Sequence, residues 1–140
     1  MIAFRFKPGP CLISVPVVVW GPRRSPSDLV FVLDTGTERT IIDVAIAARL
    51  GFTEEQALRR SRVVSALGAE AGFVVRAPRI RALGWDRDDF PIACHQLGTN
   101  ARIDGLIGAD FFDGLRLVID YGTGVVEVSE SSGTPGQAAP

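Results

Sequence analysis

Short apolar runs, separated by clusters of glycine, proline and polar residues, recur along most of the chain. β-Branched and aromatic residues are frequent in these runs, which is more typical of strands than of helices. The pattern therefore predicts a mostly β fold class, with turns at the polar clusters. The predicted strands are residues 3–6, 11–20, 29–33, 40–42, 62–66, 73–77, 80–83, 90–94, 115–120 and 125–128.

Short connections join the first three predicted strands, so we expect these strands to adjoin one another in one sheet. Pro16 lies inside the second strand, where its missing amide hydrogen favours a bend or a sheet edge. Residues 29–33 are five apolar residues in a row. Such a run suits a strand that is buried on both faces.

Only short segments carry helical signals, so we expect one or two short helices. Asp43 is a typical N-cap residue, residues 44–50 form a short apolar-rich helix after it, and Gly51 is a typical C-terminal stop. Residues 53–56 have capping-box spacing for a further helical turn, and residues 109–113 form another short turn before a glycine.

Glycine-bearing segments between strands predict β-hairpins. Residues 62–66 and 73–77 flank the small residues 67–72, which predicts a hairpin whose tip can move. Residues 84–89 predict a longer turn between the next two strands, and residues 121–124 predict a tight turn near the C-terminus.

Composition indicates one folded domain. The chain has 140 residues, of which 46% are hydrophobic, enough to bury a sizeable core. We expect residues 1–129 to form the domain, and residues 130–140, rich in Ser, Gly, Pro, Gln and Ala, to form a disordered tail. The net charge of −1 argues against nucleic acid or an anionic membrane as a partner.

No apolar run approaches the roughly 20 residues that span a bilayer, and the N-terminus lacks a basic leader with an apolar core. A cytoplasmic location is therefore expected. Cys11 and Cys94 each lie in an apolar run, which favours buried, reduced thiols over one disulfide. His95 is the only histidine and has no carboxylate cluster beside it, so we expect a structural role and no metal site.

An Asp-Thr-Gly sequence, Asp34 to Gly36, follows the apolar run at residues 29–33 directly. A carboxylate at the end of a buried strand is costly unless it has partners, and hydroxyls at Thr35 and Thr37 flank the glycine. Gly36 permits a turn or a close approach that a Cβ would block. This makeup fits a general acid or base, whereas the tripeptide alone also fits an ordinary turn.

A second segment, residues 103–114, favours the general acid or base over the ordinary turn. In it Gly105 and Gly108 bracket two aliphatic residues, and a helical turn follows. An apolar strand into Asp-Thr-Gly, a short helix, a glycine-tipped hairpin and then an aliphatic-aliphatic-Gly element resemble the retropepsins, which are single-lobed aspartic peptidases. The resemblance covers residues 11–128 and is closest to bacterial retropepsin-like domains. It implies an acid-protease lobe, a closed or partly open β-barrel with short helices.

The resemblance also implies roles for individual residues. Asp34 would be the catalytic aspartate, Thr35 would bond across two subunits, Gly36 would allow the tight loop, and Thr37 would donate to the carboxylate. A hydroxyl donor stabilises an ionised carboxylate, so Thr37 also predicts an acidic or mildly acidic optimum. Leu106, Ile107 and Gly108 would support the loop from beneath. The substrate-binding flap would comprise Leu67, Gly68, Ala69, Glu70, Ala71 and Gly72.

An aspartic peptidase needs two carboxylates, and this chain has one Asp-Thr-Gly. The resemblance therefore implies a homodimeric endopeptidase that hydrolyses extended peptide or protein segments with an activated water and without a cofactor. Asp120 lies in a similar sequence, for which a plain hairpin turn is the favoured interpretation. We expect Asp104, Asp110 and Asp113 to be capping and turn residues. The alternative function is a non-catalytic dimerisation or peptide-binding module that retains the fold.

Overall fold

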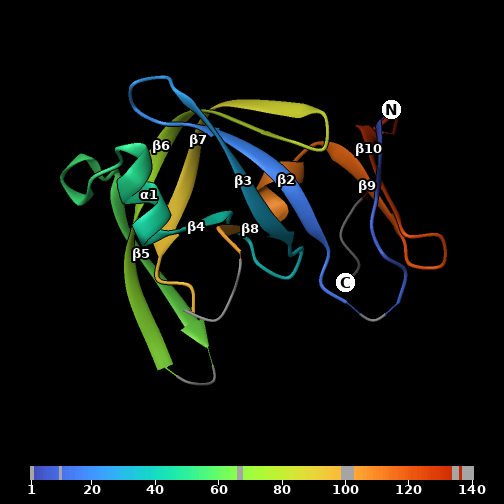
Figure 1. Ribbon diagram of the computed structural model, residues 1–140, viewed down its shortest axis with the longest axis horizontal. Helices are drawn as coiled ribbons and strands as arrows, with labels where there is room; N and C mark the ends of the chain where they lie inside the picture. The colour runs from blue at the N-terminus through green and yellow to red at the C-terminus, as the bar shows by residue number, and fades with distance from the viewer. Residues whose placement is uncertain (1, 10, 66–67, 99–102, 134–135, 137–140) are drawn as a thin grey trace.

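The computed structural model describes residues 2–9, 11–65, 68–98, 103–133 and 136 (Figure 1). Strands dominate this part of the chain, and the helices are short. The strands are β1 (Ile2–Arg5), β2 (Ser14–Trp20), β3 (Pro26–Leu33), β4 (Ile41–Asp43), β5 (Arg59–Ser65), β6 (Gly68–Ala82), β7 (Trp85–His95), β8 (Gly105–Ile107), β9 (Leu115–Asp120) and β10 (Val125–Glu130). The helices are α1 (Val44–Leu50) and the 3₁₀ turns η1 (Glu54–Gln56) and η2 (Ala109–Phe112).

Six of the described strands close into a barrel. The larger sheet has the order β2-β3-β8-β4-β7-β6-β5, and a further pairing of β2 with β6 closes the ring. β5 pairs with β6 alone, so it is the edge strand of this sheet. The β5–β6 hairpin projects beyond the barrel in Figure 1. The predicted mostly β class and the closed barrel with short helices are confirmed.

Apolar side chains on the inner faces of the strands form the main core. Phe31, Ile42 and Ile107 come from three different strands, and all three are fully buried. Phe111 of η2 is equally buried, and its ring meets the ring of Phe90 edge to face, with 6.0 Å between centroids. Burial of these large side chains stabilises the barrel and holds η2 against it.

A second, smaller apolar cluster lies apart from the main core. It consists of the buried Ile41, Val74 and Ala93, with Leu97 and Leu106 half-buried against them. Because side chains alternate along a strand, Leu106 faces the opposite side from Ile107, which is in the main core. The sheet around β4, β7 and β8 therefore has apolar side chains on both faces.

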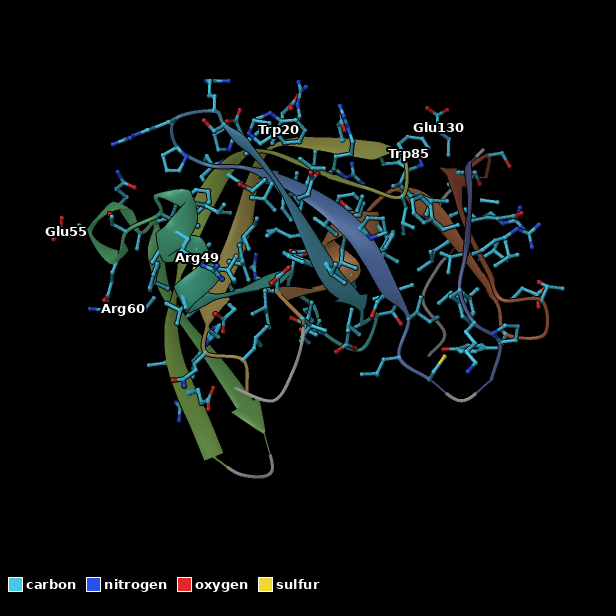
Figure 2. All side chains as sticks on the ribbon, viewed as in Figure 1. Trp20, Arg49, Glu55, Arg60, Trp85 and Glu130 are labelled. Atoms are coloured by element: carbon cyan, nitrogen blue, oxygen red, sulfur yellow. The ribbon has the colours of Figure 1, made fainter. Side chains whose placement is uncertain are left out.

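The prediction that the first three strands adjoin in one sheet is wrong for the first of them. β2 and β3 pair over their whole lengths, but β1 pairs with β10 in a separate sheet of order β1-β10-β9. Val126 and Val128 of β10 are buried, so the pairing with β1 is accompanied by burial of apolar side chains. The residues next to β1 in the sequence do not indicate this distant partner. Trp85 Nε1 donates to the Val128 carbonyl oxygen (3.4 Å) and links the barrel to this sheet (Figure 2).

Pro16 lies where β2 has only one neighbour. β2 pairs with β3 from Ser14 to Trp20, but with β6 only from Val17 to Trp20. The proline therefore precedes the two-sided part of the strand, where a missing amide hydrogen would cost a ladder hydrogen bond. The expected edge character holds at this position, although β2 as a whole is an inner strand.

Two turns are tighter than predicted. Ser65 pairs with Gly68, so residues 68–72 belong to β6 instead of to the hairpin tip, and residues 66–67 lie outside the described part. β6 then continues to Ala82, and the turn before β7 is Leu83-Gly84, both with positive φ (53° and 81°). Residues 85–89 therefore extend the ladder, in which Arg–Asp pairs face each other across the strands.

The helix predictions are confirmed in position. Asp43 caps α1 by accepting from the amides of its first turn, and Gly51 ends it with φ 99°. Thr53 makes no side-chain cap bond to η1, so the capping box predicted there does not form. In the described ranges no helix is long and apolar enough to cross a membrane. β10 extends to Glu130, and most of the predicted tail lies outside the described residues.

Both cysteines are free thiols, but only Cys94 is buried as predicted. Cys11 is exposed, because β2 begins after it, and its Sγ donates to the Lys7 carbonyl oxygen (3.2 Å). Burial raises the pKa of the Cys94 thiol to about 12.

This difference predicts that one thiol of the native protein reacts. The thiolate is the reactive form, so a disulfide reagent near neutral pH should modify Cys11 within minutes and leave Cys94 unmodified until the chain unfolds. Mass spectrometry of the labelled protein, with and without denaturant, measures both rates. Equal labelling rates in the native protein would contradict the buried position of Cys94.

Candidate active site

Asp34 lies in a tight loop that starts where β3 ends. Its backbone amide donates to the Ile107 carbonyl oxygen (2.9 Å), which continues the parallel pairing of β3 with β8 by one residue. Its Oδ1 accepts from the Gly36 amide (3.0 Å). The side chain is half-buried, and no described cation lies within ion-pair distance of it. One carboxylate oxygen is thus held by the loop, and the group is still accessible to water.

The strand before Asp34 is less buried than its sequence suggests. Phe31 and Val32 are buried on opposite faces, but Val30 is 42% exposed. Val30 and Val32 share a face, and on the neighbouring strand Leu106 pairs with Val32. The face that leads to Asp34 therefore carries apolar side chains that are partly open to solvent.

Backbone hydrogen bonds fasten the loop to the segment after β8. The Thr37 carbonyl oxygen accepts from the Ala109 amide (2.9 Å), and the Glu38 carbonyl oxygen accepts from the Asp110 amide (3.1 Å). A Cβ on Gly108 would lie 2.6 Å from the Arg39 carbonyl carbon, which is closer than real Cβ atoms approach. Glycine at 108 is therefore what lets the two segments touch. Leu106, Ile107 and Gly108 lie beside the loop, and their supporting role stays a prediction.

Thr40 and Asp110 form a second link that sequence reasoning missed. Thr40 is fully buried. Asp110 Oδ1 accepts from the Thr40 amide (2.9 Å) and hydroxyl (2.7 Å), and Thr40 Oγ1 accepts from the Gly108 amide (3.1 Å). Asp110 was expected to be a capping or turn residue; instead its carboxylate joins η2 to the start of β4. No local pattern signals a bond between residues 70 positions apart.

The hydroxyls of the Asp-Thr-Gly-Thr sequence point to different partners from those expected. Thr37 Oγ1 donates to the Arg39 carbonyl oxygen (3.3 Å), so in the protomer it does not donate to Asp34. The predicted acidic pH optimum of activity was based on this donor, so in the protomer that basis is absent. The Gly36 amide is the group that bonds to the carboxylate, and a Cβ at 36 would lie 3.2 Å from Asp34 Oδ1. Thr35 is exposed.

Five of the six residues predicted for a flap lie in β6 on the β5–β6 hairpin, and their role as a flap stays a prediction. Gly68 to Gly72 pair with residues 61–65 of β5, and Leu67 is outside the described part. Glu70 and Ala71 are exposed.

The other aspartates have backbone partners of their own. Asp104 Oδ2 accepts from the Val30 amide (2.8 Å) at the start of β8, so it extends strand pairing and does not cap a helix, and Asp113 occupies the C-cap position of η2. Asp120 Oδ1 accepts from the amides of Gly122 and Thr123. Hydrogen bonds from Thr123 are the main cause that holds the pKa of the Asp120 carboxyl below its ordinary value. The hairpin-turn interpretation of Asp120 is confirmed.

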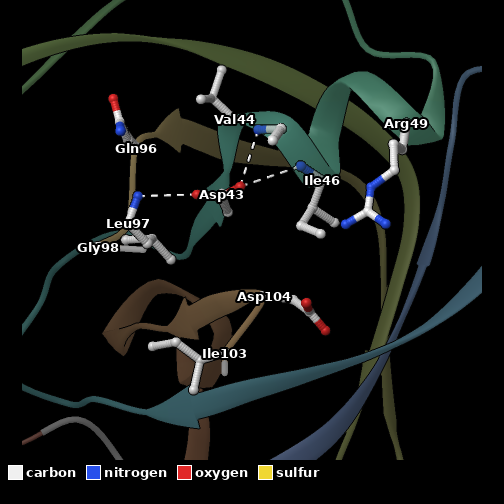
Figure 3. Close-up of a pocket in the computed structure, with 10 residues that line it drawn as sticks. Asp43, Val44, Ile46, Arg49, Gln96, Leu97, Gly98, Ile103 and Asp104 are labelled. Atoms are coloured by element: carbon white, nitrogen blue, oxygen red, sulfur yellow. Dashed lines mark hydrogen bonds between the residues drawn. The ribbon is translucent and has the colours of Figure 1, made fainter. Parts of the chain in front are cut away.

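A cavity of about 560 Å³ lies beside α1, and Asp34 does not line it (Figure 3). Its two carboxylates are both engaged. Asp43 accepts from the amides of Ala45, Ile46 and Leu97, and Asp104 accepts from Val30. Within the described residues, no three His, Cys, Asp or Glu side chains converge as metal ligands would.

Residues 15–111, more than half of the chain, match the family model described as aspartyl protease. The chain belongs to the aspartyl protease family. The match runs from β2 into η2, so it includes the Asp34 loop, the β5–β6 hairpin and the Leu106-Ile107-Gly108 support.

Two solved structures resemble this member of the aspartyl protease family. A retropepsin-like aspartic protease from Rickettsia conorii has a TM-score of 0.66 and 12% identity, over 91% of this chain and 98% of its own. The retroviral protease-like domain of Ddi1 from Leishmania major has a TM-score of 0.56 and 16% identity, over 89% of this chain and 98% of its own. At these identities the likeness shows the fold, which is retropepsin-like. A comparison with curated proteins gave no match.

Proposed function

We propose that the chain is an aspartic endopeptidase that acts as a homodimer, with Asp34 of each protomer on either side of one catalytic water. The observation that carries this proposal is the Asp34 loop. Backbone bonds fix it to β8 and to Ala109 of η2, while the carboxylate itself is half-exposed and unpaired with any described cation. A fixed carboxylate that is open to water is what general acid–base catalysis requires.

The chemistry follows from placing two carboxylates close together. Like charges disfavour double ionisation, so such a pair holds one proton between them. The ionised carboxylate takes a proton from the water as its oxygen attacks the peptide carbonyl carbon, and the protonated carboxyl donates to the carbonyl oxygen. A proton then passes to the leaving nitrogen, the C–N bond breaks, and the pair returns to its starting state. Gly36 and Thr37 hold the geometry of the loop, and Thr35 bonds across the two subunits.

A second copy of the chain is the source of the second carboxylate in this proposal. The chain has one Asp-Thr-Gly, and Asp120, the other candidate, is engaged by its own turn. Leu12 is 76% exposed and adjoins Ile13, whose carbonyl oxygen accepts from the Leu33 amide beside the loop (2.8 Å). A closed twofold arrangement would cover such an apolar side chain.

The substrate in this proposal is an extended peptide, and the β5–β6 hairpin acts as a flap over it. β5 has an unpaired edge, and extended peptides bind proteins by adding a strand to such an edge or lying along a sheet. Leu106 and Leu97 are half-buried on the face that also carries Val30 and Val32. This face offers apolar contacts for alternate side chains of the peptide next to Asp34.

The dimer requirement predicts that specific activity rises with protein concentration. The test incubates a library of quenched fluorescent peptides at several pH values between about pH 4 and about pH 8, over a range of protein concentrations. Light scattering on the same samples should show the mass rise from 15.0 kDa towards about twice that value as activity appears. Constant activity at the monomer mass would contradict the shared water, and tight peptide binding without cleavage would favour the binding-module alternative.

A further inference from the structure

His95 lies where the β5–β6 hairpin meets the barrel. It is the last residue of β7, it is 3% exposed, and it follows Cys94, which pairs with Phe73 of β6. Its Nε2 is 2.7 Å from the hydroxyl oxygen of Ser61 on β5. One imidazole thus contacts both strands of the hairpin at its base, since Ser61 pairs with Gly72 of β6.

The backbone of Gly72 packs directly against the imidazole ring. A Cβ at position 72 would lie 2.6 Å from His95 Nδ1 and would also collide with the Cys94 carbonyl oxygen. Nδ1 is buried and has no hydrogen-bond partner among the described residues. We call the contact of His95 with Ser61 and Gly72 the His95 contact. It fits closely around the imidazole ring, and Nδ1 of this ring is enclosed without a hydrogen-bond partner among the described residues.

The charged groups around His95 are few. Glu70 on β6 is two residues from Gly72 on the same face, and its carboxylate favours the protonated ring. Glu54 of η1 and Arg60 of β5 line a cavity that His95 and Gly72 also line, and they pair with each other. Asp43 of β4 is in register with His95, and backbone amides hold both of its carboxylate oxygens.

Burial is the stronger influence, and it lowers the pKa of His95 below its ordinary value of 6.5, with Glu70 opposing it. A ring that is exposed by opening of the hairpin would recover the ordinary pKa. The closed hairpin therefore binds fewer protons than the open one. Its stability is complete above about pH 6.5, is lost progressively as the pH falls towards the lowered pKa, and changes no further below it.

We propose that the His95 contact is a proton-dependent latch: neutral His95 holds the β5–β6 hairpin against the end of β7, and protonation releases the hairpin. The neutral ring accepts or donates one bond to Ser61 and leaves Nδ1 uncharged in its enclosure. The protonated ring carries a charge and a second N–H where the described residues offer no acceptor, and opening exposes both to water. This inference needs no peptidase activity. If the chain does cleave peptides, mild acid would also open the way for substrate.

The wild-type protein allows a direct test, because its one histidine gives one imidazole Cε1–H resonance. NMR titration gives the midpoint of His95, and amide hydrogen exchange, divided by the intrinsic rates, gives the protection of Ser61 and of residues 68–72. We expect hairpin protection to fall between about pH 7.5 and about pH 5, with the protection of β2 and β3 unchanged. The fall should begin near about pH 6.5, where an exposed ring titrates, and level off below the NMR midpoint of His95. A hairpin that keeps its protection while His95 titrates would overturn the proposal.

Two variants sharpen this test. His95→Gln cannot titrate but can still bond to Ser61, so hairpin protection should become equal at the two pH values. Glu70→Gln removes the carboxylate that favours protonation, so the His95 midpoint should move to lower pH and the loss of protection should move with it. A pH-dependent hairpin in folded His95→Gln would overturn the proposal. If that variant does not fold, the wild-type titration decides, and protection that does not fall between about pH 6.5 and the His95 midpoint overturns the proposal.

Discussion

Asp34→Asn is expected to lower peptide cleavage by about a thousandfold or more while leaving the fold and the dimer intact. The amide has nearly the same shape as the carboxylate, and its oxygen can still accept from the Gly36 amide. It cannot take a proton from water or hold the shared proton, so both general-base and general-acid catalysis are lost. Unfolding in urea should differ from wild type by no more than about 0.5 kcal/mol.

Mixed dimers make this prediction specific to the shared water. When wild-type and Asp34→Asn chains are mixed in equal amounts, unfolded together and refolded, random pairing leaves about a quarter of the dimers with two carboxylates. The activity of the mixture should therefore be about a quarter of the activity of a sample in which every chain is wild type, at the same total chain concentration. A fall to one half would mean that each Asp34 acts alone.

Asp120→Asn is the matched control, because Asp120 lies in the other Asp-containing turn whose sequence resembles that of the Asp34 loop. Its carboxylate bonds to the amides of its own hairpin turn, and the side chain is exposed. We expect activity close to wild type in this variant. Loss of cleavage in Asp120→Asn with retention in Asp34→Asn would reassign the catalytic residue.

Local signals in the sequence predicted much of the fold. Asp43 and Gly51 bound α1 as their residue types indicate, and the hairpin of β9 with β10 forms around the predicted turn. Such features depend on side chains that contact backbone a few residues away. The resemblance to a known family also led to residues 106–108, which lie beside the Asp34 loop in the structure, because a family supplies long-range contacts that periodicity does not.

The misses involve contacts between residues distant in sequence. Nothing near β1 indicates that it pairs with β10 across the whole chain, and nothing near Thr40 indicates its bond to Asp110. The partner of the Thr37 hydroxyl was missed for a related reason, since a rotatable hydroxyl has several acceptors in reach and only the folded loop selects one. Sequence patterns predicted the residues of the candidate site, and only the tertiary structure shows how these residues are held.

Thr40→Val is expected to lower the free energy of unfolding by about 2–3 kcal/mol, a large effect for a change that preserves side-chain shape. Thr40 is fully buried and its hydroxyl makes two bonds, donating to Asp110 Oδ1 and accepting from the Gly108 amide. The methyl group that replaces it leaves one donor of the Gly108 backbone without a partner and one bond to the Asp110 carboxylate unmade. Unfolding in urea, with the slope compared between variants, measures this loss.

The same substitution tests whether the Thr40–Asp110 link positions the Asp34 loop as well as stabilising the fold. The link joins β4 to the start of η2, next to the bonds that Ala109 and Asp110 amides make to the loop. Loss of the link should displace the Asp34 carboxylate relative to Asp34 of the second protomer in the proposed dimer. This displacement should lower kcat more than it raises KM, because a small error in position costs most in the transition state. Thr40→Ser keeps the hydroxyl and should lose only about 1 kcal/mol with kcat nearly unchanged. If Thr40→Val and Thr40→Ser have the same kcat, the link is structural alone.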